Sequence, residues 1–324
     1  MVRLPDFYVV GAPKCGTTSL YHYLRQHSGV FMPEVKEPNF FCSDFPSIQK
    51  CKTVQDYSTL FSTAHESQLI GEASPWYLYS KTAVQNILEV QPHAKFIVML
   101  RNPVDAVISH FNYMRYFLVE DCEDILGAVS LEDRGIKREG ALRHRHAQPF
   151  LNYKGLFSYS EQIARIQKLV PSENLHVVFF EDFFQKPHQN FPAITNFLNL
   201  PQQDIFIGAH NQAKEWRFDF VRKFLVNQTG VSQRAIVETI RFLKRHNINI
   251  RDTILNFLSK KGGKQSVDAA THELLQNIFA EDVNELKKML QLSAASAWDN
   301  EGTVTIKTES TAHRPISTFE TVLG

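Results

Sequence analysis

The chain has 324 residues, 43% of them hydrophobic, which is enough to bury the core of a sizeable domain. Its 35 basic and 34 acidic side chains nearly cancel, and the formal net charge of +1 argues against a general nucleic-acid partner. No N-terminal apolar segment of signal or membrane length is found, so the sequence predicts a cytoplasmic protein without a membrane partner. The four cysteines lack paired spacing and are expected to be free thiols.

Predicted strands and helices alternate along the chain, which is typical of a single α/β domain with a central, mostly parallel sheet flanked by helices. We expect this domain to cover residues 1–298 and the Ser- and Thr-rich tail 299–324 to be flexible. Strands are predicted at 5–11, 69–73, 95–100 and 175–181, and helices at 16–27, 80–91, 103–118, 189–198 and 271–290. Two further helices are expected within 210–265, followed by a loop over 260–264.

The first loop has the layout of a phosphate-binding turn. A β-branched strand end runs into a loop bounded by Gly11 and Gly16, and apolar residues at helical spacing follow. The glycine spacing matches the start of a Walker A loop, but Thr17 follows the second glycine and the lysine, Lys14, lies inside the loop. The loop therefore keeps the features of an anion-binding site, but its lysine stands at a different position from the lysine in the loop of a kinase or GTPase.

A second segment places a cation at the end of a buried strand. The apolar run 95–100 ends at Arg101, Pro103 suits the first turn of a helix, and Ser109 lies about two turns further on. Open α/β sheets bind ligands at the carboxyl ends of their strands. A planar guanidinium and a hydroxyl that converge there form a receptor for a terminal phosphate monoester.

The third segment is the block 36–41, in which Lys36 and Glu37 precede a proline and two phenylalanines, Phe40 and Phe41. A partly buried carboxylate beside an anionic donor can take the proton of an acceptor hydroxyl, and Lys36 would offset the charge of a transferring group. The flanking aromatic residues favour burial over a solvated Lys-Glu pair.

Together these segments resemble the sulfotransferases that use 3′-phosphoadenosine 5′-phosphosulfate (PAPS), in particular the Golgi-type and bacterial branch with a Lys-Glu-Pro-x-Phe-Phe block. The resemblance covers roughly residues 5–298 and implies the P-loop NTPase-like sulfotransferase fold. It implies transfer of the sulfuryl group from PAPS to an acceptor, with adenosine 3′,5′-bisphosphate (PAP) as the product and no metal. One departure is Phe157, which stands where the family has a tyrosine, so any hydrogen bond from that hydroxyl is absent.

The resemblance also implies roles for individual residues. Glu37 would act as the general base, with Lys36 beside it, and Lys14 would stabilise the bridging oxygen of the leaving nucleotide. Arg101 and Ser109 would bind the 3′-phosphate. The 5′-phosphosulfate would be held by Lys14, Cys15, Gly16, Thr17, Thr18 and Ser19. The family's C-terminal arginine clamp is missing, and Lys261 or Lys264 is the expected substitute.

Several alternatives stay open. Glu72 and Ser74 either contact the acceptor or the sulfonate, or belong to a strand-ending Ser-Pro turn. A P-loop small-molecule kinase or NTPase is disfavoured by the order of the loop residues, and a non-catalytic nucleotide-binding module has no use for Glu37. The acceptor is expected to be a small molecule, such as a natural product, modified at a hydroxyl; an amine, a carbamoyl nitrogen or a glycan is not excluded.

Overall fold

The computed structural model describes residues 3–117, 119–120, 122–133, 148–206, 208, 214–216, 259–261, 267–291 and 298. The expected tail 299–324 and most of the two helices expected within 210–265 lie outside these residues.

A five-stranded parallel sheet forms the centre of the described part of the chain. Its order is β2-β3-β1-β4-β5, and every printed pairing within it is parallel. The prediction of an α/β fold with a mostly parallel sheet is therefore confirmed, and the four predicted strands are found. The strands are β1 (Phe7–Gly11), β2 (Val30–Phe31), β3 (Leu69–Ala73), β4 (Lys95–Leu100) and β5 (Leu175–Phe179).

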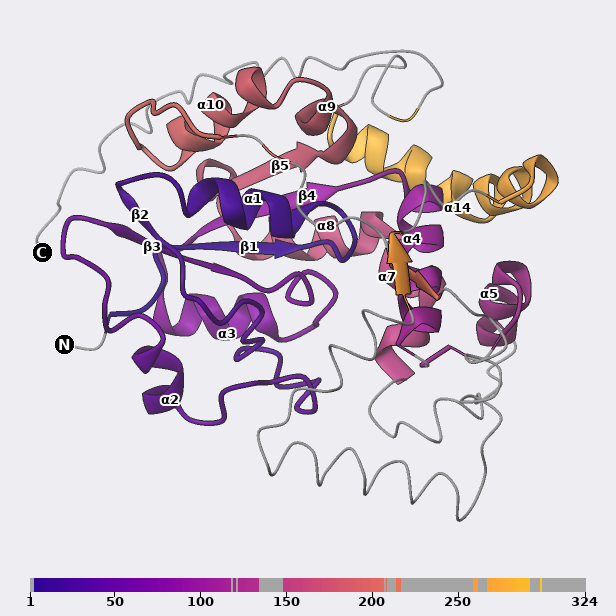
Figure 1. The fold of residues 1–324 in the computed structure, drawn as a ribbon, viewed down its shortest axis with the longest axis horizontal. Helices are drawn as coiled ribbons and strands as arrows, with labels where there is room; N and C mark the ends of the chain where they lie inside the picture. Colours follow the sequence, from indigo (N-terminus) through magenta and orange to yellow (C-terminus); the bar gives the residue numbers. More distant parts are fainter. Residues whose placement is uncertain are drawn as a thin grey trace, which may run out of the picture.

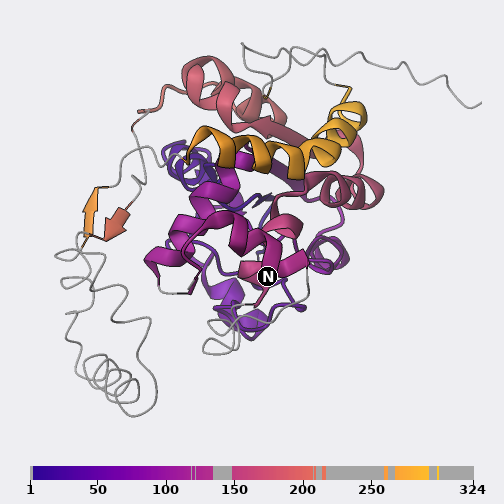
Figure 2. The same cartoon turned by 90° about the vertical axis from the view of Figure 1, so that its right-hand side faces the viewer.

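Helices cover both faces of this sheet, which explains why its central strand, β1, contains no charged residue. In Figures 1 and 2, α1 (Thr17–Leu24) lies on one face, and α3 (Ala83–Val90) and α8 (Tyr159–Leu169) lie on the other. All five residues of β1 are buried, as expected for a strand that is covered on both sides.

The carboxyl ends of the strands face a group of helices that Figure 1 draws beyond the right-hand edge of the sheet. The largest is α4 (Pro103–Tyr116), accompanied by α5 (Ile125–Asp133) and α7 (Tyr153–Phe157). Helix α4 begins where the sequence predicts, because the Asn102 side chain accepts a hydrogen bond from the Val104 amide (3.0 Å) and Pro103 occupies the first helical position.

The remaining helices complete the layers. Asp282 of the long C-terminal helix accepts hydrogen bonds from the amides of Tyr159 (2.7 Å) and Ser160 (3.0 Å), which fixes the start of α8. The remaining helices are α2 (Val54–Thr59), α9 (Phe180–Gln185), α10 (Pro187–Phe197), the long C-terminal α14 (Ala269–Met289) and the 3₁₀ turns Gln148–Leu151 and Ser172–Asn174.

Several sequence-based boundaries differ from the structure. The helix predicted at 16–27 ends at Leu24, and the helix predicted at 80–91 begins at Ala83. The strand predicted to run to Glu181 ends at Phe179, because α9 begins at Phe180 and takes Glu181 into its first turn, where acidic side chains are favoured. The loop predicted from residue 260 is also incorrect at its start. Lys261 belongs to β7 (Ser259–Lys261), which gains backbone hydrogen bonds by pairing antiparallel with β6 (Lys214–Trp216). Lys264 lies outside the described residues.

Candidate functional site

The first loop joins the carboxyl end of β1 to the amino end of α1. Gly16 caps the helix in the left-handed region (φ 85°), and no side chain caps the first turn, so its N–H groups are left for an anion. A Cβ atom on Gly16 would lie 2.5 Å from the Phe184 ring, so a larger residue does not fit there. Lys14 also has a backbone conformation in the left-handed region (φ 64°).

Lys14 is an unusual cation because no ion pair for it is found among the described residues. Its Nζ atom lies 4.1 Å from the centroid of the Tyr113 ring, an arrangement that stabilises the charge only in part. The pKa of Lys14 is lowered to about 8, chiefly by burial and in smaller part by the charge of Arg101, while the nearby Glu37 carboxylate opposes the fall. The Lys14 ammonium is therefore available to an incoming anion.

The other loop residues divide by the direction of their side chains. Cys15 is fully buried, its Sγ lies 3.6 Å from the Tyr159 hydroxyl, and burial raises the pKa of its thiol to about 12. Its side chain points into the core, and only its backbone is left to contact a ligand. Thr17 and Ser19 are also buried, whereas Thr18 is half-buried.

The Lys36-Glu37 pair forms the second part of the site. Lys36 Nζ lies 2.5 Å from Glu37 Oε1, and the side chains are 17% and 34% exposed. Glu37 is in the left-handed region (φ 57°), and its amide donates to the Ala73 carbonyl at the end of β3 (3.1 Å). The loop is thus attached to the same sheet edge as Lys14, and the prediction that this pair is partly buried is confirmed.

Arg101 follows the last residue of β4 and reaches the same edge. Its guanidinium lies 4.6 Å from the Phe180 ring centroid and 3.6 Å from Asp105, while its buried Nε has no partner among the described residues. Asp105, Ser109 and Tyr113 follow at intervals of four and so share one face of α4. Since Tyr113 reaches Lys14, this face of the helix is turned toward the first loop.

Glu181 and Trp298 support the Arg101 corner, and sequence reasoning missed this role. Glu181 accepts hydrogen bonds from the Asn102 amide (2.9 Å) and from the Trp298 indole N–H (3.2 Å). Burial raises the pKa of the Glu181 carboxyl, and hydrogen bonds from these groups oppose the rise. The Glu-Asp pair at the start of α9 was the available signal, but its partners are distant in sequence.

Glu72 and Ser74 do not face an acceptor, because both are completely buried. Glu72 accepts hydrogen bonds from Tyr57 and Tyr77, and Ser74 Oγ accepts one from the Asn39 amide (3.1 Å). Burial raises the pKa of the Glu72 carboxyl to about 7, while the hydrogen bonds and the charge of Lys36 oppose the rise. The interpretation of these residues as contacts to the acceptor is not supported by this geometry.

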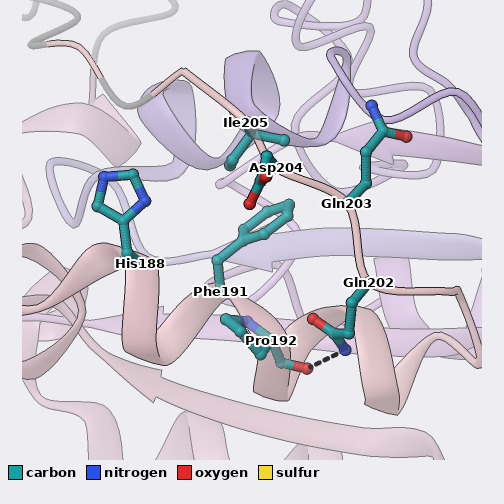
Figure 3. Close-up of a pocket in the computed structure, with 7 residues that line it drawn as sticks. All are labelled: His188, Phe191, Pro192, Gln202, Gln203, Asp204 and Ile205. Carbon is teal, nitrogen blue, oxygen red and sulfur yellow. Dashed lines mark hydrogen bonds between the residues drawn. The ribbon is translucent and has the colours of Figure 1, made fainter.

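Other hollows of the described surface lie elsewhere. Figure 3 shows the residues that line a cavity between α10 and residues 202–205, among them His188, Phe191 and Asp204. The volume of this cavity is about 340 Å³. None of the predicted site residues lines it. Among the described residues, no group of three His, Cys, Asp or Glu side chains could hold a metal ion.

Comparison with known proteins identifies the architecture and the family. A sulfotransferase from Alicyclobacillus acidocaldarius has the same fold, with a TM-score of 0.63 and 23% identity over 90% of this chain and 97% of that one. Residues 4–287 match the sulfotransferase domain family. The chain therefore belongs to this family, and the resemblance found in the sequence is confirmed.

Curated relatives include carbohydrate-modifying enzymes. Human carbohydrate sulfotransferase 15 is 32% identical over 34% of this chain and 27% of its own length. Mouse heparan sulfate glucosamine 3-O-sulfotransferase 5 is 23% identical over 70% of this chain and 64% of its own length. The chain thus matches about a quarter of the first of these relatives. No helix in the described part of the chain has the length and apolar character needed to cross a bilayer.

We expect the Glu72 carboxyl to make the protein less stable as the pH rises from 5 to 8. The pKa of this group is 4.5 in the reference state and about 7 in the fold, so the folded state binds the extra proton and loses stability as that proton leaves. The shift corresponds to at most about 3 kcal/mol. Urea unfolding at both pH values should show a flatter pH dependence for Glu72→Gln than for wild type; parallel curves would contradict the shift.

Proposed function

We propose that the chain transfers the sulfuryl group of PAPS to a hydroxyl of a small-molecule acceptor by in-line displacement. The observation that carries the proposal is the convergence of Lys14, Glu37 and Arg101 at the carboxyl edge of one parallel sheet, close enough for Glu37 and Arg101 to change the pKa of Lys14. One site thus offers a base to the acceptor and two cations to the donor.

The two anionic groups of PAPS suit different segments of the fold. The first-turn amides of α1 and Lys14 suit the 5′-phosphosulfate, since an uncapped helix start and a cation without an ion pair both favour an anion. Arg101, with an unpartnered Nε, and Ser109, on the face of α4 that Tyr113 shares, suit the 3′-phosphate. Lys261 and Lys264 remain candidates from the sequence for the missing clamp.

In the proposed reaction the acceptor oxygen attacks sulfur while the bond between sulfur and the 5′-phosphate oxygen breaks. The acceptor proton passes to Glu37, and Lys14 stabilises the negative charge that develops on the leaving oxygen. Lys36 lies beside Glu37 and offsets the charge of the transferring group. Because lysines and amides supply the positive charge, the proposal includes no metal.

The proposal also covers the class of acceptor and the location of the protein. A hydroxyl of a small molecule, such as a natural product, is the proposed target, with an amine or carbamoyl nitrogen as a variant. The carbohydrate-modifying relatives support a test with glycans as well. A cytoplasmic location, without nucleic-acid or membrane partners, stays a prediction from the sequence.

The nucleotide site is tested first. Wild type should bind PAP in preference to ATP with magnesium in isothermal titration. Arg101→Ala should weaken PAP binding by about 30-fold, because a charge-assisted contact to the 3′-phosphate is lost. Affinity for adenosine 5′-phosphate, which lacks that phosphate, should be unchanged. Arg25→Ala, at the other end of α1, is the control. A preference for ATP–magnesium would favour an NTPase and overturn the proposal.

Affinity for PAP should fall above pH 8, by up to about tenfold for each pH unit, because Lys14 must be protonated to bind an anion and its pKa is about 8. Burial raises the pKa of the neighbouring Cys15 thiol to about 12 and also raises the pKa of Tyr113, so neither group accounts for a change near pH 8. Titrations between pH 7 and 10 should give a flat profile for Lys14→Arg. A wild-type profile that is equally flat would remove Lys14 from the donor site.

Glu37→Gln should lower the rate of sulfation by about 100-fold or more, because the proposed base is lost. PAP affinity should change less than about threefold, because the base acts only on the acceptor proton. The matched control is Glu34→Gln, three residues earlier in the same loop with a side chain that is 89% exposed. The measurement uses labelled PAPS with a panel of phenols, alcohols, amines and heparan sulfate. An active Glu37→Gln variant would exclude Glu37 as the base.

A further inference from the structure

A buried carboxylate lies directly behind the loop that carries Glu37. Glu72, near the end of β3, is 0% exposed, and its Oε2 atom accepts hydrogen bonds from the hydroxyls of Tyr57 (2.7 Å) and Tyr77 (2.8 Å). Burying a carboxyl group is costly even when it is hydrogen-bonded, so an apolar side chain would serve the core better. The transfer proposed above makes no use of this group.

Both tyrosines extend from Glu72 to the loop. The Tyr77 hydroxyl accepts a hydrogen bond from the Phe41 amide at 3.4 Å. The Tyr57 ring stacks on Phe40, with centroids 4.4 Å apart and an interplanar angle of 11°, and meets the edge of Phe41 at 5.3 Å. Glu72 thus fixes two rings that hold the C-terminal end of the block 36–41.

The loop needs such support because its backbone is in a sparsely populated conformation. Glu37 and Asn39 both have positive φ angles, 57° and 51°. Residues other than glycine keep such angles only where their surroundings determine them. Two further hydrogen bonds tie the loop to β3 and the residue after it, from the Glu37 amide to the Ala73 carbonyl and from the Asn39 amide to Ser74 Oγ.

We propose that Glu72 is a positioning residue for Glu37: as the acceptor for Tyr57 and Tyr77, it holds the block 36–41 in the geometry in which Glu37 faces the donor. The inference rests on the proposed function for the role of Glu37, but the restraint on the loop is independent of it.

The hydrogen-bond acceptor, and not the negative charge, carries this role. Glu72 Oε1 is buried, and no hydrogen bond of normal geometry to it is found among the described residues. The same holds for the hydroxyl of Tyr8, which lies opposite Glu72 in the parallel register of β1 and β3. A glutamine at position 72 keeps the oxygen that both tyrosines use and places an amide N–H₂ at the position of Oε1. Glutamine should therefore replace glutamate, whereas alanine should not.

Hydrogen exchange of the loop amides is the direct test. In Glu72→Ala the amides of Glu37, Asn39, Phe40 and Phe41 should exchange about tenfold faster or more, since the acceptor that fixes Tyr57 and Tyr77 is lost. Glu72→Gln should exchange like wild type. Tyr77→Phe, which removes the acceptor of the Phe41 amide, gives the same result as alanine and serves if Glu72→Ala does not fold. Tyr23→Phe, which loses a hydrogen bond to Gly208, is the control.

Turnover measurements distinguish a positioning role of Glu72 from a general disruption of the fold. The probe is release of PAP and sulfate from PAPS with water as the acceptor, together with PAP titration. Glu72→Ala should lower kcat about tenfold or more with an unchanged KM for PAPS and unchanged PAP affinity, and Glu72→Gln should restore kcat. In a Glu37→Gln background, Glu72→Ala should cause no further loss, because both act through Glu37.

Three results would overturn the proposal: loop exchange unchanged in Glu72→Ala and Tyr77→Phe, parallel losses of PAP affinity and kcat, or a glutamine variant as impaired as alanine. Failure of the proposed function gives a different pattern. If the loop exchanges faster in Glu72→Ala but Glu37→Gln keeps full turnover, the restraint exists and Glu37 is not the base.

Discussion

The site depends on one cation, Lys14, for which no ion pair is found in the part of the chain that the structure describes. Lys14 reaches the carboxyl edge of the sheet on a loop with two left-handed residues, and its charge rests against the Tyr113 ring. Removing an ammonium group from water costs free energy unless an anion neutralises its charge. The lowered pKa of the half-buried Lys14 reflects this cost. The neighbouring elements, β3 with the Glu37 loop and β4 with Arg101, are arranged around this charge.

Two carboxylates, the buried Glu72 and the half-buried Glu181, extend this arrangement beneath the surface. Glu72 fixes tyrosines behind the loop of Glu37, and Glu181 fixes the backbone at Asn102, next to Arg101. The segments that carry Glu37 and Arg101 are thus each supported by a hydrogen-bonded acid on a neighbouring element. Such a second layer keeps a strained loop and a strand exit in fixed positions, which preorganises the charges before a ligand arrives.

Local patterns in the sequence were sufficient for four of the five strands, but not for the two-residue β2. The long buried strands read as apolar runs, and the eight-residue spacing placed Arg101 just before α4 and Ser109 about two turns further on. The contact of Tyr113 with Lys14 had no local signal, since an aromatic residue on an amphipathic helix usually belongs to the core. Glu72 did carry a signal, an acid within an apolar strand, but its tyrosine partners come from separate elements.

Two cations at the site, Lys36 and Arg101, are already paired with carboxylates. Lys36 is 2.5 Å from Glu37 and Arg101 is 3.6 Å from Asp105, so each cation already has a carboxylate that it can leave. In the proposed transfer, the sulfuryl group attracts Lys36 and Lys14 as charge develops on the leaving oxygen. Glu37 then loses its counter-charge at the step in which the acceptor proton must depart, so the positive charge that binds the donor also releases the base.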